Sequence, residues 1–223
     1  MKKLTLALLL AGLSSIASTA ANAEAITFNF SNAGLYNGTV LASTNATFAT
    51  ATFDNTSYDG FITLTMKVLP VLDDGAYVND WAFNVADGSV VTGVTFKSGT
   101  EANSYDKGTS SVNNLGGNKG DFDLGFSFKN GNPGQLQNGS SVYALSGTNL
   151  TLSSFGINNA FGLPDGIHVQ ALGQNGKDSS FFSSVEGGGK DTEVPEPATT
   201  ALLGLGLLGF AASRRKAAKN KNA

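Results

Sequence analysis

Cysteine is absent from this chain of 223 residues, so no disulfide bond can hold its fold together. A chain of this length can form a core large enough to do without disulfides. The absence is therefore compatible with export from the cell but is not evidence for it. Stability has to come from the hydrophobic core and from backbone hydrogen bonds.

Basic side chains are scarce between the two ends of the chain. The ends hold seven of the fourteen Lys and Arg residues, namely Lys2, Lys3, Arg214, Arg215, Lys216, Lys219 and Lys221. The stretch from Glu24 to Pro197 keeps seven basic residues against seventeen acidic ones, and the difference is a formal net charge of −10. We expect no nucleic-acid partner, because neutralising phosphates requires a basic face.

Histidine occurs once, as His168, so any Ser-His-Asp catalytic group would have to use it. His168 alternates with the apolar Ile167 and Val169 and shares a face with Gln170. The sequence has no Gly-x-Ser-x-Gly motif, which presents the nucleophilic serine in many hydrolases. We interpret His168 as a solvent-facing strand residue and expect no enzymatic activity.

Alternation of apolar and polar residues dominates the middle of the chain. In the clearest run, Ile62, Leu64, Met66 and Val68 are separated by polar residues. A period of two with one apolar face is typical of a half-buried strand. Similar runs predict strands at 26–30, 47–53, 81–85, 90–96, 122–128, 142–145, 150–155 and 167–172.

Turn-forming pairs such as Asp165-Gly166 separate these runs, and no segment of this region has convincing helical periodicity. About nine short strands predict an all-β fold, an antiparallel β-sandwich of jelly-roll type. Trp81 is in phase with Phe83 and Val85, which favours a core position over a sugar-stacking surface position. Residues 98–120 are polar and rich in Gly, Asn and Ser, and we expect a long loop there.

The N-terminus has the three parts of a secretory signal peptide. Lys2 and Lys3 precede an apolar run, and Ala21 and Ala23 form an Ala-x-Ala cleavage site. We predict that residues 1–23 form a signal helix, direct the chain to the Sec export machinery and are then removed.

The C-terminus also has three parts in a fixed order. The Pro195-Glu196-Pro197 element should be extended, because its two prolines fix φ and disfavour helix before them. The apolar residues 198–212 would span about 22 Å as a helix, short of the ~30 Å hydrocarbon core, yet they are strongly membrane-seeking. Arg214, Arg215 and Lys216 should stay cytoplasmic and act as a membrane stop.

This tail resembles the PEP-CTERM sorting signal of exported proteins in Gram-negative bacteria that make extracellular polysaccharide. The resemblance covers residues 194 to about 216. It implies that exosortase, a membrane cysteine protease-transpeptidase, cuts the chain near Pro195-Glu196-Pro197. The protein would then be an inner-membrane-anchored intermediate first, and a cell-surface or extracellular-matrix protein afterwards.

These features divide the chain into four parts. We predict a signal peptide at 1–23, a β-sandwich domain at 24–182, a flexible linker at 183–193 that contains Gly187, Gly188 and Gly189, and the sorting signal at 194–223. The linker would let the processing enzyme reach the tail while the domain stays folded.

Asp121 and Asp123 flank Phe122 and should point to one face of a strand, about 7 Å apart at Cα. Paired carboxylates are typical of glycosidases. With carbonyl oxygens from the preceding loop they would also suit Ca²⁺. The third interpretation, which we favour, is a solvent-facing side opposite Phe122 and Leu124, so we expect no cofactor and keep calcium as an alternative.

Three functions are compatible with these observations. The first is a non-enzymatic surface or matrix protein with a structural or adhesive role in exopolysaccharide or biofilm. The second is a carbohydrate-binding module for matrix glycan, and the third is a hydrolase.

Overall fold

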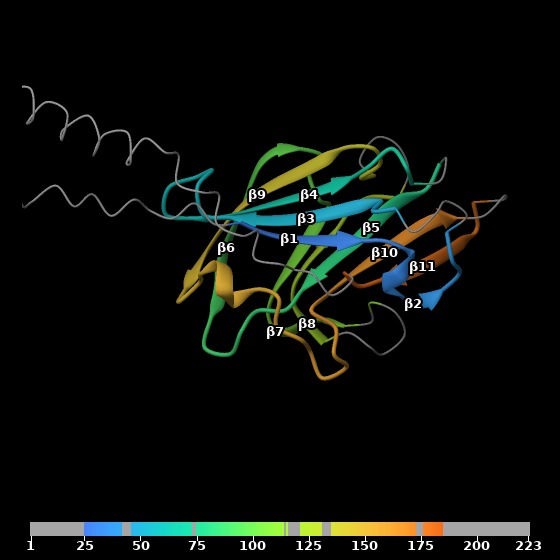
Figure 1. Ribbon diagram of the computed structural model, residues 1–223. Coiled ribbons are helices and arrows are strands. Elements are labelled where there is room, and N and C mark those ends of the chain that lie inside the picture. Colours follow the sequence, from blue (N-terminus) through green and yellow to red (C-terminus); the bar gives the residue numbers. More distant parts are fainter. Residues whose placement is uncertain are drawn as a thin grey trace, which may run out of the picture.

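The computed structural model describes residues 25–41, 46–72, 75–113, 115, 121–130, 135–172 and 176–184. These residues form eleven strands and two short 3-10 turns (Figure 1). The strands are β1 (Ala25–Phe30), β2 (Leu35–Gly38), β3 (Ala49–Asp54), β4 (Ile62–Val68), β5 (Tyr77–Phe83), β6 (Val90–Gly99), β7 (Ser104–Asn113), β8 (Asp121–Ser127), β9 (Ser140–Thr148), β10 (Asp165–Leu172) and β11 (Asp178–Phe182). The turns are η1 (Asn32–Gly34) and η2 (Leu152–Ser154).

The strands form two antiparallel sheets. Sheet A has the order β1-β3-β4-β9-β6, and sheet B has the order β2-β11-β10-β5-β8-β7. Among consecutive strands, only β3–β4, β7–β8 and β10–β11 pair within one sheet, and the other seven of the ten connections cross between the sheets. The prediction of an all-β antiparallel fold is confirmed. The finer description as a jelly roll stays a prediction, and both terminal helices fall outside the described residues.

The sheets pack face to face through aromatic side chains. Phe30 of β1 meets Trp81 of β5 edge to face, with ring centroids 5.5 Å apart. Phe53 of β3 meets Phe83 of β5 at 5.1 Å in the same way. Such contacts add about 0.5–1.5 kcal/mol per pair to the gain from burying the rings. Because each pair joins one sheet to the other, the two layers form a sandwich.

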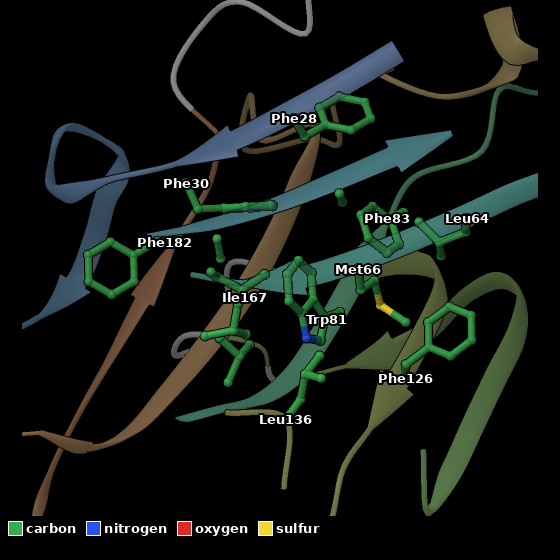
Figure 2. Close-up of a cluster of buried hydrophobic side chains, with 14 of the residues drawn as sticks. Phe28, Phe30, Leu64, Met66, Trp81, Phe83, Phe126, Leu136, Ile167 and Phe182 are labelled. Atoms are coloured by element: carbon green, nitrogen blue, oxygen red, sulfur yellow. The ribbon is translucent and has the colours of Figure 1, made fainter. Parts of the chain in front are cut away.

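Trp81 lies at the centre of this core. Its exposed fraction is 0%, and Figure 2 shows its indole surrounded by Phe30, Met66, Leu136 and other apolar side chains from both sheets. Burying a large apolar side chain contributes roughly 1.5–3 kcal/mol. The predicted core position of Trp81 is therefore confirmed, and a sugar-stacking role for it is excluded.

Two local expectations were wrong. The polar stretch at 98–120 is not one long loop, because β7 occupies Ser104–Asn113 as an edge strand of sheet B. The strand expected at 150–155 is instead the η2 turn, in which the side chains of Thr151 and Ser154 cap each other's backbone N–H groups. Reciprocal side-chain caps of this kind satisfy the donors at the start of a helical turn.

Candidate functional site

The point where the chain leaves the domain toward its C-terminal tail is held by one carboxylate. Strand β11 ends at Phe182, and the next two residues turn back onto Asp165 at the start of β10. The Ser183 hydroxyl donates to Asp165 Oδ1 at 3.1 Å, and the Ser184 backbone N–H donates to the same oxygen at 2.7 Å. The Ser184 hydroxyl donates to Asp165 Oδ2 at 2.6 Å. We call this group of three residues the exit clamp.

The carboxylate of the exit clamp is fully buried. Asp165 has an exposed fraction of 0%, and burial raises its pKa to about 6 even though the hydrogen bonds from Ser184 and Ser183 lower it. A buried carboxylate is costly unless donors satisfy its oxygens. Both oxygens accept hydrogen bonds here, so the side chain can stay inside and order the two serines.

Backbone contacts hold the same segment from the opposite side. The Ser183 N–H donates to the Gly34 carbonyl oxygen at 2.9 Å. A Cβ on Gly34 would lie only 1.9 Å from the Ser183 carbonyl oxygen, so this close approach requires glycine. Phe182, just before the clamp, is 0% exposed and packs edge to face against Phe48, with centroids 5.0 Å apart. The described part of the chain thus ends on a firmly held point.

This held point limits the reach of the tail. Ser184 is the last described residue, and Pro195 follows eleven residues later in the sequence. Eleven residues span at most about 40 Å when fully extended. The first two residues of the predicted linker therefore belong to the clamp, and its remainder, 185–193, lies outside the described residues.

Comparison with known families decides what this tail is. Residues 193–216 match the family model of the PEP-CTERM protein-sorting motif. The chain carries a PEP-CTERM sorting signal. A PEP-CTERM protein is exported and is processed by exosortase. No curated protein and no solved structure matches the chain significantly.

The sorting residues predicted from the sequence fall outside the described part of this PEP-CTERM protein. They are Ala21 and Ala23 at the signal cleavage site, Pro195, Glu196 and Pro197 at the processing site, and Arg214, Arg215 and Lys216 at the membrane stop. Their individual roles stay predictions. Within the described residues, no helix has the length and apolarity needed to cross a membrane.

Asp121 and Asp123 lie on β8 as the alternation predicts, with Phe122 buried between them. Asp121 is exposed, whereas the half-buried Asp123 accepts the Val85 N–H on Oδ2 at 2.9 Å. Asp123 also lines a pocket of about 100 Å³ with Asp87. In the described residues, no three His, Cys, Asp or Glu side chains are close enough together to hold a metal ion. Metal binding by Asp121 and Asp123 stays a prediction.

His168 shares a face of β10 with Gln170 as expected, but its side chain is not solvated. Only 15% of that side chain is exposed. Its ring stacks on Phe181, with centroids 4.2 Å apart, and its Nδ1 lies 3.1 Å from Asp80 Oδ2. The interpretation of His168 as a solvent-facing residue was therefore wrong, because β11 covers its ring with Phe181 and β5 supplies the carboxylate of Asp80.

The residues around His168 do not have the geometry of a catalytic triad. The Ser127 hydroxyl donates to Asp80 Oδ1 at 2.7 Å, so the carboxylate lies between the serine and the imidazole. A triad needs the imidazole in that middle position, where it can take the serine proton. Burial would raise the pKa of Asp80, but hydrogen bonds from His168, Asn79 and Ser127 hold it below its ordinary value.

The exit clamp was missed from the sequence because Asp165-Gly166 is a typical turn pair. A signal was nevertheless present. Asp165 lies two residues before Ile167 and four before Val169, both of which are 0% exposed. That phase places the carboxylate on the inner face of β10.

Proposed function

We propose that this chain is a non-enzymatic protein that exosortase delivers to the cell surface or extracellular matrix of a Gram-negative bacterium. There it has a structural or adhesive role in exopolysaccharide or biofilm. The observation that carries the proposal is the sorting motif at 193–216, which is separated by eight residues from the firmly held exit of a β-sandwich. A domain that stays folded while its tail is processed is suited to a permanent place outside the cell.

Two contacts support the absence of catalysis. Ser127 donates to Asp80 rather than to His168, and Asp123 is committed to the Val85 N–H. The Ser127 hydroxyl is therefore not paired with the imidazole that a nucleophilic serine would need, and one oxygen of Asp123 serves a structural hydrogen bond.

The proposal is tested in the native host with a deletion strain. The strain is complemented either with the full chain or with a variant that lacks 194–223. We expect the full chain to restore surface-exposed protein and cohesion of the biofilm, and the tail-less variant to be secreted into the medium without restoring cohesion. Equal cohesion of the deletion strain and its parent would reject the structural or adhesive role.

A second function, binding of matrix glycan, is favoured by one surface feature. Tyr58 and Phe61 lie in the β3–β4 loop with 36% and 38% of their surface exposed. Lys97 of β6 places Nζ 4.8 Å from the Tyr58 ring centroid and 5.7 Å from that of Phe61. Exposed rings offer apolar faces to sugar rings, and the ammonium group offers hydrogen bonds to their hydroxyls.

Pull-down on polysaccharide from the host tests this second function. A Tyr58→Ala/Phe61→Ala variant should lose retention at least tenfold, whereas Phe161→Ala, which removes another exposed ring, should not. Retention that is absent in the unsubstituted protein, or equal in all three, would exclude glycan binding by this surface.

A further inference from the structure

We propose that Asp165 is a positioning residue for C-terminal processing, because the exit clamp fixes the point from which the sorting tail starts and so sets its reach. This inference rests on the proposed cleavage near Pro195-Glu196-Pro197. It assigns to a residue in the folded domain an effect on a reaction that takes place in the tail.

The geometry of the clamp supports this role. Among the described residues, Ser183 and Ser184, the last two before the tail, donate three hydrogen bonds to the Asp165 carboxylate. The carboxylate is 0% exposed, so water does not compete for these bonds. Charge-assisted hydrogen bonds are roughly twice as strong as neutral ones, and fraying of this end is correspondingly suppressed.

The clamp changes, by a countable amount, the number of residues between the last held position and the processing site. With the clamp closed, ten residues, 185–194, lie between the held Ser184 and Pro195. With it open, the next held residue is Ser183, whose backbone N–H still donates to the Gly34 carbonyl oxygen at 2.9 Å. Opening therefore adds one residue, or about 3.5 Å, to the reach of the processing site.

A linker-shortening series measures this difference. The full chain is expressed in a bacterium that carries exosortase, with one to eight residues removed from 185–193, and the processed fraction is read by gel shift. Each deletion is made in the unsubstituted background and with the clamp opened by Asp165→Ala or by Ser184→Pro. The second substitution removes both the Ser184 hydroxyl and its N–H and leaves the core untouched.

We expect the shortest linker that still permits processing to become one residue shorter in both opened backgrounds. Ser179→Ala, which alters an exposed serine on the same strand, should leave the threshold unchanged. Leu64→Ala, a core substitution in sheet A, should lower the amount of protein without moving the threshold.

Two results would overturn the inference. One is the same threshold in the opened and closed backgrounds. The other is a processed fraction that falls at every length in the opened backgrounds in proportion to lost stability. Mass spectrometry of the full-length linker sample separates these results from failure of the proposed function: if the chain is not cut near Pro195–Pro197 at all, the cleavage proposal itself fails.

Discussion

The buried carboxylate of Asp165 should give the domain an unusual dependence of stability on pH. Its pKa in the folded protein is about 6, against 3.8 for an ordinary aspartate. A pKa that folding raises means that the folded state binds the proton more tightly, so the stabilising effect of protonation is complete below about pH 4 and is lost as the pH rises through 6. A difference of roughly two units corresponds to about 3 kcal/mol in the free energy of unfolding.

Substituting Asp165→Asn isolates this contribution, because the other carboxylates are the same in both proteins. Urea unfolding of the exported chain at intervals from pH 4 to pH 7.5 gives the free energy of unfolding of each. We expect the variant to be the less stable protein at pH 4 and to gain about 3 kcal/mol relative to the unsubstituted chain by pH 7. The exposed Asp178→Asn should show a constant difference. A constant difference for Asp165→Asn as well, or a difference of opposite slope, would refute the reasoning.

Three further substitutions test the packing. Gly34→Ala should lower the free energy of unfolding by about 1–3 kcal/mol in a urea titration, because its Cβ would overlap the Ser183 carbonyl oxygen. The control Gly139→Ala should be near neutral, because its Cβ would have its nearest neighbour at 3.6 Å. Equal effects of the two substitutions would contradict the close approach at Gly34. Trp81→Ala should lower the free energy of unfolding by about 3–5 kcal/mol. In the unsubstituted protein, the fluorescence of this single tryptophan should be blue-shifted in the folded state and move to the red on unfolding. Red-shifted emission in the folded state would contradict the burial of Trp81. Asp80→Ala should lower the free energy of unfolding by about 1–3 kcal/mol at pH 7, because it leaves His168, Asn79 and Ser127 without their shared acceptor. This loss should shrink below pH 3.8, as the pH passes the lowered pKa of Asp80 in the folded protein. A loss that does not change with pH would contradict this.

Alternation along the sequence was sufficient to predict most strands that have one face in the core, but not β11, in which Ser180 and Phe182 are buried. In β4, Ile62, Leu64, Met66 and Val68 are all buried, and in β8 the apolar residues predicted to point inward do so. The phase of Trp81 with Phe83 likewise predicted its place in the core. A period of two is reliable in such strands because a slip of one residue would expose the whole apolar face.

The two edge strands of sheet B could not be predicted in this way, unlike β1 and β6 at the edges of sheet A. β2 and β7 lie at the two edges of sheet B, and β2 has no buried residue. An edge strand pairs on one side only and often carries polar residues or glycine, so its sequence resembles a loop. The strand character of β7 follows from its pairing with β8, which is a contact between segments and not a local preference.

The surroundings of His168 and Asp165 likewise could not be predicted from local sequence patterns. Phe181, which covers the imidazole, follows His168 by thirteen residues, and Asp80 precedes it by eighty-eight. The donors that allow Asp165 to be buried come from the residues after β11. The sorting tail could be predicted because its parts act through local composition and order, which the match at 193–216 confirms.

Mass spectrometry of the mature C-terminus, on protein recovered from the native host, tests the central claim most directly. We predict a chain that begins after Ala23, ends near Pro197 and is found in the surface or matrix fraction. Intact protein recovered from the cytosol, with residues 1–23 and 198–223 still attached, would contradict export and processing together.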